Sequence, residues 1–248
     1  ATLDSVEYVI FCGVHFMAET ADMLTPEGVR VILPDMRAGC SMADMAEIDQ
    51  VEDAWEVLQE ATDKKIIPIT YINSTAALKA FVGRNGGAVC TSSNARSVVE
   101  WAFTQGDKLL FFPDQHLGRN TCADLGYDIE KMLVFDPYQD DGGHELEDYD
   151  ESPVILWKGH CSVHQNFKAS HPDIMRKRIP DVKILVHPEC PYEVVQQADL
   201  AGSTKFIIET VKNAPAGSKW AIGTEHHLVN RLKQEHPEQT IGTLAPFA

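Results

Sequence analysis

The sequence has little positive charge, no long apolar run and no closely spaced cysteines. Its 248 residues include 21 lysines and arginines against 37 aspartates and glutamates, a formal net charge of −16 at pH 7. Binding to a nucleic-acid backbone or to an anionic membrane surface requires a basic surface, so neither is expected as a partner. A small anionic substrate remains compatible with this charge, because a pocket can be locally positive in an acidic protein.

No apolar run reaches the roughly 18 residues that a membrane-spanning helix needs. The start of the sequence also lacks a basic segment followed by an apolar core, the pattern of a secretory signal peptide. Both absences indicate a cytoplasmic location. The chain begins without Met on a strand-like segment at 6–12 and ends just after another apolar run, so we expect a piece of a longer fold.

The cysteines form no CxxC pair, which argues against zinc ribbons and thioredoxin-type redox motifs. Structural disulfides are rare in the cytosol, so most of these thiols are expected to be small buried side chains. The six are Cys12, Cys40, Cys90, Cys122, Cys161 and Cys190.

Short apolar segments alternate with helical patterns along the chain. Most of these segments are continuously apolar, which is typical of parallel strands covered on both faces. The alternation predicts an α/β fold with parallel sheets, whose ligands bind at loops after the carboxyl ends of strands. We expect strands at 6–12, 29–33, 66–71, 87–91, 108–112, 132–135, 153–157, 182–187, 204–208 and 219–222, and helices at 43–46, 54–62, 76–82, 97–105 and 228–235.

An internal repeat is the most informative feature. Three strand ends are each followed by a short turn, a histidine and the apolar start of a helix, at 11–16, 112–117 and 222–227. In the first two copies a second strand then leads to Cys40 or Cys161, and in the third copy the equivalent position falls just past Ala248. The sequence therefore predicts most of a three-repeat protein.

A second repeated element supports the first. Segments 69–78 and 185–194 each run from a strand through two polar residues to a helix start. Each is followed by a hydroxyl pair, at 91–92 and 203–204. Three equivalent loops around a pseudo-threefold axis would bring three thiols together, which suits an iron–sulfur cluster or a Cys₃ zinc site with one open metal position. On spacing alone, loop cysteines without a metal are the alternative.

Seven motifs occur in order: GVHFMAETA at 13–21, LPDMRAGCSMAD at 33–44, TYINS at 70–74, CTSSNA at 90–95, FPDQHL at 112–117, LWKGHCSVH at 156–164 and VHPECP at 186–191. Together they closely resemble the quinolinate synthase family of bacterial NAD biosynthesis, along essentially the whole chain. The resemblance implies three αβα domains related by a pseudo-threefold axis, each with a small parallel sheet. We expect them at 1–62, 63–180 and 181–248.

The resemblance also implies the reaction and the cofactor. The family condenses iminoaspartate with dihydroxyacetone phosphate into quinolinate, with loss of phosphate and two waters. It uses a [4Fe–4S] cluster on three cysteines, whose open iron acts as a Lewis acid. An aspartate oxidase or an aspartate dehydrogenase is the implied source of iminoaspartate. Cys40 and Cys161 match two cluster ligands, and the third is expected just beyond Ala248; the other four cysteines are interpreted as packing residues.

Further site residues are carried over from matching motifs. Tyr71 and Asn73 match substrate-binding residues, with a strand end and helix cap as the alternative role. Ser92, Ser203 and Thr204 match hydroxyls that hold a substrate carboxylate or phosphate, and simple helix capping is their alternative.

The remaining carry-over concerns acid–base chemistry. His187 and Glu189 match the family's His-Pro-Glu site. We expect Glu189 to act as the general base and His187 to bind a substrate oxygen or donate a proton, and Tyr71 could shuttle a proton. A carboxylate favoured by a helix N-terminus is the alternative for Glu189. His164 is a candidate to bind substrate, or a loop residue with no role. The repeat histidines His15, His116 and His226 are interpreted as structural.

Two other classes of function stay open. One is a zinc-dependent α/β hydrolase or lyase that uses Cys40, Cys161 and His164. The other is a non-catalytic α/β binding module. Analysis of bound iron and sulfide would separate them from the cluster enzyme.

Overall fold

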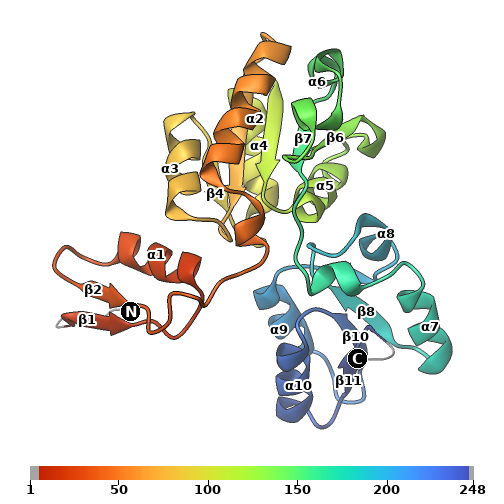
Figure 1. Cartoon of the computed structure of the whole chain (residues 1–248). Coiled ribbons are helices and arrows are strands. Elements are labelled where there is room, and N and C mark those ends of the chain that lie inside the picture. The colour runs from red at the N-terminus through yellow and green to blue at the C-terminus, as the bar shows by residue number, and fades with distance from the viewer. Residues whose placement is uncertain (1–5, 246–248) are drawn as a thin grey trace.

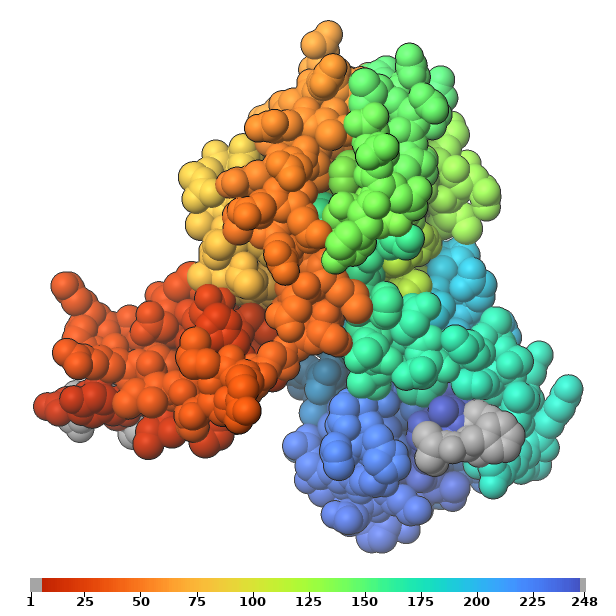
Figure 2. Space-filling model, in the orientation of Figure 1, coloured from red at the N-terminus to blue at the C-terminus, as the bar shows by residue number. Residues whose placement is uncertain are grey.

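Three small sheets, each with its own helices, form three lobes (Figure 1). The computed structural model describes residues 6–245. All the strand pairs in the three sheets are parallel, so the predicted α/β class is confirmed. On the face drawn in Figure 2, a gap separates the first and third lobes, and the second lobe adjoins both. Among residues 6–245, no helix is long and apolar enough to cross a bilayer.

The first lobe is the smallest. Strands β1 (Tyr8–Ile10) and β2 (Arg30–Ile32) pair, and helix α1 (His15–Leu24) connects them. The expectation that strands are covered on both faces does not hold for this pair, because Tyr8, Ile10 and Ile32 are exposed by 54%, 68% and 45%. The segment after β2 includes a 3₁₀ turn at Ala43–Met45 and leads to the second lobe.

The second lobe holds a five-stranded sheet in the order β4-β3-β5-β7-β6. Because side chains alternate across a strand, the sheet has two apolar faces. Ile66, Leu110 and Phe112 pack with α2 and α3 on one face, and Ile67 and Leu109 pack with α4 and α5 on the other. The strands are β3 (Ile66–Tyr71), β4 (Ala88–Cys90), β5 (Lys108–Phe112), β6 (Met132–Phe135) and β7 (Val154–Trp157), and the helices are α2 (Ile48–Ala61), α3 (Ala76–Arg84), α4 (Ala95–Gln105), α5 (Gln115–Asp124) and α6 (Leu146–Glu151), with 3₁₀ turns at Ile129–Lys131 and Asp140–Gly143.

The third lobe repeats this plan on a four-stranded sheet in the order β11-β10-β8-β9. Helices α7 and α8 contribute to the apolar cluster on one face, and α9 and α10 to the cluster on the other. Its elements are a 3₁₀ turn at His164–Asn166, α7 (His171–Arg178), β8 (Lys183–Val186), α8 (Tyr192–Val195), β9 (Leu200–Ala201), α9 (Thr204–Lys212), β10 (Lys219–Gly223), α10 (His226–Glu235) and β11 (Thr240–Thr243).

The strand order confirms the repeat that the sequence predicts. The order β4-β3-β5-β7 of the second lobe matches β9-β8-β10-β11 of the third, with β6 as an added edge strand. The β1–β2 pair corresponds to β5–β7 and β10–β11. Helices α1 and α10 begin at the repeat histidines His15 and His226, and His116 is the second residue of α5.

One expected strand is wrong. Residues 204–208 begin helix α9, because Ser203 caps its start by accepting a hydrogen bond from the Phe206 N–H and because Ile207 and Val211 are buried one helical turn apart. No range was predicted for α1, α5, α6, α7 or α8, and the helix expected at 43–46 is a 3₁₀ turn. Helix α2 packs on the five-stranded sheet although it lies within the first expected domain, 1–62. The division into 1–62, 63–180 and 181–248 stays a prediction.

Candidate active site

The expected site residues lie where strands of the second and third lobes end. Tyr71 is the last residue of β3, Cys161 follows β7, and His187 and Glu189 follow β8. These are the carboxyl ends of parallel strands, where α/β proteins bind ligands. The structure brings side chains from both lobes together.

Two histidines flank one buried carboxylate. His164 Nδ1 lies 2.8 Å from Glu189 Oε2, an ion-pair contact without the direction of a hydrogen bond. His187 Nδ1 lies 3.8 Å from Glu189 Oε1 and accepts a hydrogen bond from the Glu189 backbone N–H at 3.3 Å. The two imidazole rings stack with centroids 4.7 Å apart. All three side chains are buried, so their charges interact with little screening by water.

These contacts shift the pKa values of the three groups in different directions. Burial opposes the charged form of His164, but its contacts with Cys161 and Glu189 outweigh burial and raise its pKa to about 10. Burial lowers the pKa of His187 to about 4 against the attraction of Glu189. Burial also opposes ionisation of Glu189, yet the two histidines hold the pKa of its carboxyl well below its usual range. The carboxylate therefore stays ionised.

Tyr71 and Ser92 adjoin this group. Burial, and secondly the charge of Glu189, raise the pKa of Tyr71, so its phenol keeps its proton. The Tyr71 hydroxyl interacts with both Glu189 and Ser92. Asn73 is half-buried in the loop after β3.

The hydroxyl pair after β9 has a capping role. Ser203 is buried and caps α9, whereas Thr204 is exposed at the first residue of that helix. Helix capping, the alternative role expected for this pair, is therefore filled by Ser203. A role of Ser203 or Thr204 in substrate binding stays a prediction.

The two predicted cluster cysteines lie on adjoining loops. Ser41 Oγ donates to Ser162 Oγ at 3.2 Å, which joins the residue after Cys40 to the residue after Cys161. Both thiols are free and half-buried, and both pack against the same apolar cluster. The arrangement fits two ligands of an iron–sulfur cluster, for which thiolates are the usual protein ligands.

A second donor set includes only one of these thiols. Cys161, His164 and Glu189 offer ligand atoms that all lie within 4.8 Å of one another. A thiol, an imidazole and a carboxylate suit zinc better than an iron–sulfur cluster. Of the cysteines expected to pack, Cys90, Cys122 and Cys190 are buried, but Cys12 is exposed, so the packing interpretation is wrong for Cys12.

Two buried polar residues that contact the site, Asp114 and Thr224, were not predicted from the sequence. Asp114 Oδ2 accepts a hydrogen bond from the Cys161 N–H at 3.2 Å, while its Oδ1 caps α5 by accepting from Leu117 N–H at 2.7 Å. Burial and the charge of Glu189 raise the pKa of Asp114. Thr224 Oγ1 lies 3.3 Å from His164 Nε2. Both residues stand two positions before a repeat histidine, and that shared position was the available signal.

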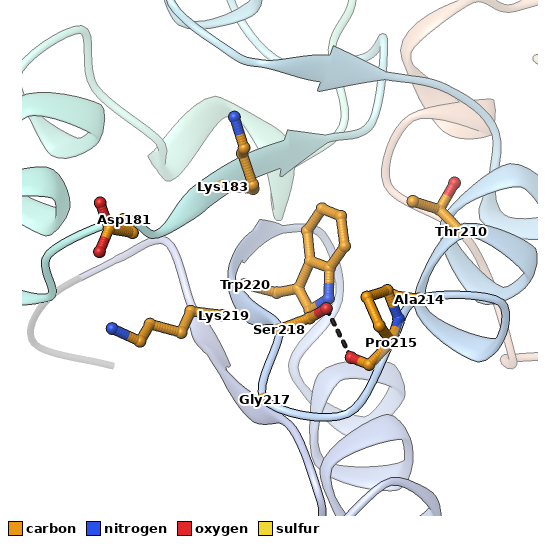
Figure 3. A pocket seen from close by; sticks show the side chains of 9 residues that line it. All are labelled: Asp181, Lys183, Thr210, Ala214, Pro215, Gly217, Ser218, Lys219 and Trp220. Carbon is orange, nitrogen blue, oxygen red and sulfur yellow. Dashed lines mark hydrogen bonds between the residues drawn. The ribbon is translucent and has the colours of Figure 1, made fainter.

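A cavity of about 610 Å³ lies elsewhere, at the amino ends of β8 and β10 (Figure 3). Its two lysines already have partners: Lys183 Nζ lies 3.6 Å from Asp199, and Lys219 Nζ donates to the Pro180 carbonyl at 2.8 Å. Glu189 follows the carboxyl end of β8, so the cavity lies at the opposite end of this sheet. None of the expected site residues lines the cavity.

Comparison with known proteins agrees with the resemblance seen in the motifs. The family described as Quinolinate synthetase A protein matches residues 1–247. A quinolinate synthase of Geobacillus sp. (strain WCH70) is 62% identical over 244 residues, which cover 97% of this chain and 65% of that protein. A quinolinate synthase of Anoxybacillus flavithermus (strain DSM 21510 / WK1) is 64% identical over 241 residues, with the same coverage.

A quinolinate synthase of Bacillus cereus (strain ATCC 10987 / NRS 248) is 61% identical over 247 residues, which cover 100% of this chain and 67% of that protein. The chain thus spans 65% of the length of the first two curated relatives.

Proposed function

The chain belongs to the quinolinate synthetase A protein family, and we propose that the complete protein is a quinolinate synthase whose acid–base site lies in this chain. The proposed reaction condenses iminoaspartate with dihydroxyacetone phosphate and releases quinolinate, phosphate and two waters. The observation that carries the proposal is the group formed at the strand ends by the buried Tyr71, His164 and Glu189 and the half-buried Cys161. A carboxylate base beside proton donors suits the enolisation and dehydration steps that such a condensation requires.

The proposed cofactor is a [4Fe–4S] cluster. Cys40 and Cys161 would hold it, and the adjoining positions of their loops support this pairing. A third thiolate is predicted just beyond Ala248. When bound, a cluster with three protein ligands supplies one open iron that can polarise a substrate oxygen.

Glu189 would act as the general base. Its carboxylate is ionised, the protonation state that a base needs, and is shielded from water. The histidine contacts that keep it ionised also weaken it as a base, so the proton that it takes would come from a carbon acidified by an adjoining carbonyl or imine group. His187 would donate a hydrogen bond to a substrate oxygen. Because its Nδ1 accepts from the Glu189 backbone, the neutral ring carries its proton on Nε2. His164 would hold the Glu189 carboxylate in place.

Uncharged groups would bind the anionic parts of the substrates. The Tyr71 phenol keeps its proton and donates, and Asn73 offers an amide on the same loop. Ser92, Ser203 and Thr204 supply hydroxyls near the starts of α4 and α9, where anions are favoured. Iminoaspartate would come from an aspartate oxidase or an aspartate dehydrogenase.

The test uses the complete gene product, purified without oxygen. We expect about four iron and four sulfide per chain, a visible absorption band, and quinolinate formation from the two substrates. The variants Cys40→Ala and Cys161→Ala are expected to lose the iron and the activity. The variant Cys12→Ala is the matched control, because this exposed thiol should leave both unchanged.

A zinc-dependent hydrolase or lyase is the second candidate, since Cys161, His164 and Glu189 form a mixed donor set. A purified protein that holds zinc and no sulfide would favour it and overturn the cluster enzyme. A protein that holds no metal would favour the binding module.

A further inference from the structure

Helix α5 of the second lobe lies against the loop of the third lobe that carries Glu189. Asn120 lies in the middle of α5, at this contact, and is 2% exposed. Its side-chain amide donates to the Pro188 carbonyl at 2.8 Å and to the Cys190 carbonyl at 2.9 Å. One side chain thus holds the backbone immediately before and immediately after Glu189.

The backbone-to-backbone hydrogen bonds of this loop stay within the third lobe, and the Tyr71 hydroxyl of the second lobe contacts the Glu189 side chain. The His187 N–H donates to the Gly223 carbonyl at 3.0 Å, and the Cys190 N–H donates to the His187 carbonyl at 3.0 Å. They fix the shape of the loop but not its distance from the second lobe. Tyr71 and Cys161 belong to the second lobe, so the position of Glu189 relative to them depends on contacts between the lobes.

The chemistry of the amide fits this task. Its two N–H groups meet two carbonyl acceptors, while its Oδ1 is buried without a hydrogen-bond partner among the described residues. A buried polar atom without a partner is unfavourable, so the residue is explained by its donors rather than by its acceptor. An aspartate here would place carboxylate oxygens against two carbonyl oxygens.

We propose that Asn120 is a positioning residue that holds Glu189 in register with Tyr71 and Cys161 across the lobe interface. This inference rests on the proposed function, in which Glu189 is the base. A displacement of about 1 Å in a catalytic group can lower a rate by about a hundredfold.

The experiment compares Asn120→Asp and Asn120→Ala in the complete, iron-loaded protein. Both variants are expected to lower kcat by about 10- to 100-fold, with KM changed less than threefold and iron content unchanged. The key measurement is a double-mutant cycle with Glu189→Gln. If Asn120 acts through Glu189, adding Asn120→Ala to Glu189→Gln should lower the residual rate less than about twofold.

Asn85→Asp is the matched control. The Asn85 amide also donates to a backbone carbonyl, that of Phe81 at 2.9 Å, but at the end of α3. Its kcat should stay within twofold of the parent. A readout that needs no activity is amide hydrogen exchange in a peptide covering 187–191, which should become about tenfold faster in Asn120→Ala and stay unchanged in Asn85→Asp.

Several results would overturn the proposal. An equal loss of rate in the parent and Glu189→Gln backgrounds would show a role independent of Glu189. Unchanged kcat and unchanged exchange would remove the role altogether, and failure of both Asn120 variants to fold would make the residue structural. A parent protein that makes no quinolinate would instead reject the proposed function, while the exchange measurement would still decide whether Asn120 holds the loop.

Discussion

His116 is a buried histidine on α5 whose environment keeps it neutral. Its Nε2 lies 2.5 Å from Gln165 Oε1, and its Nδ1 is buried without a hydrogen-bond partner among the described residues. Burial lowers the pKa of His116 to about 4 despite the Gln165 contact, with Arg119 and His160 lowering it further. An unfolded histidine has a pKa near 6.5, so the unfolded chain binds a proton first as the pH falls.

This difference predicts a pH-dependent contribution to stability. Above pH 6.5, His116 is neutral in both the native and the unfolded state, and its protonation does not reduce the free energy of unfolding. As the pH falls from 6.5 to 4, the native state loses about 3 kcal/mol relative to the unfolded state. We therefore expect His116→Gln to show a smaller drop in melting temperature between pH 7.5 and pH 5 than the parent. His226→Gln, at an exposed repeat position, is the control; an unchanged drop in His116→Gln would contradict the prediction.

That the residues of the candidate site lie together could largely be predicted, whereas the residues that support them could not. The motifs gave Tyr71, Cys161 and Glu189, and the structure brings these together. Asp114 and Thr224 were not predicted although the repeat aligns them, because the histidine two residues later is the more conspicuous repeated residue. Asn120 carries no sequence signal, since a helical Asn that binds a distant backbone looks like any surface residue.

At the scale of elements, Lys108 joins strand β5 to the end of helix α6. This lysine is 2% exposed, and its ammonium donates to three carbonyls, those of Tyr149 at 2.8 Å, Asp150 at 2.7 Å and Ser152 at 2.6 Å. A cation at a helix C-terminus is favoured by the helix dipole. The three bonds also fix the connection that leads into β7.

We expect Lys108→Met to destabilise the protein by about 2–4 kcal/mol, because it leaves buried carbonyls without a donor. Lys219→Met is a close control, since Lys219 begins β10, the repeat counterpart of β5, and donates to a single carbonyl within residues 6–245. Its change should stay below about 1 kcal/mol. Thermal or urea unfolding followed by circular dichroism measures both; equal losses in the two variants would refute the role of the three bonds.

The sequence predicted elements best where one signal dominated. The buried strands β3, β5, β7 and β8 are continuous apolar runs, and their expected ranges overlap the observed ones. A strand was predicted wrongly at 204–208, because the start of α9 holds Phe206, Ile207 and Ile208, residue types that also favour strands. The capping serine before them was the better signal.

At the scale of the whole molecule, individual polar contacts between residues far apart in the sequence help to set how the lobes meet. Ser41 bonds to Ser162, and Asn120 bonds to the loop around Glu189. Such contacts leave no periodicity in the sequence. The repeat could therefore predict three similar units and the ends of their strands, but not which side chains of each unit touch the next.

The first lobe is docked through α1 at the start of helix α3, directly after the loop that holds Asn73 and follows Tyr71. Glu19 Oε2 accepts a hydrogen bond from the Ala76 N–H at 2.9 Å, so the carboxylate caps a helix of another lobe. Beside it, the Lys79 ammonium lies 5.6 Å from the centre of the Phe16 ring. A negative charge at a helix N-terminus is favoured by the helix dipole.

Glu19→Gln keeps the shape of this contact and removes its charge, so we expect docking of the first lobe to weaken by about 1 kcal/mol. Amide hydrogen exchange within 15–24 should become roughly five times faster, while exchange in β5 should not change. Glu27→Gln is the control, because Glu27 is exposed beyond the end of α1. Equal exchange in the two variants would mean that the apolar contacts of α1 hold the lobe by themselves. Faster exchange only in Glu19→Gln would instead show that the charge of Glu19 helps to hold the first lobe against the start of α3, three residues after Asn73 in the candidate site.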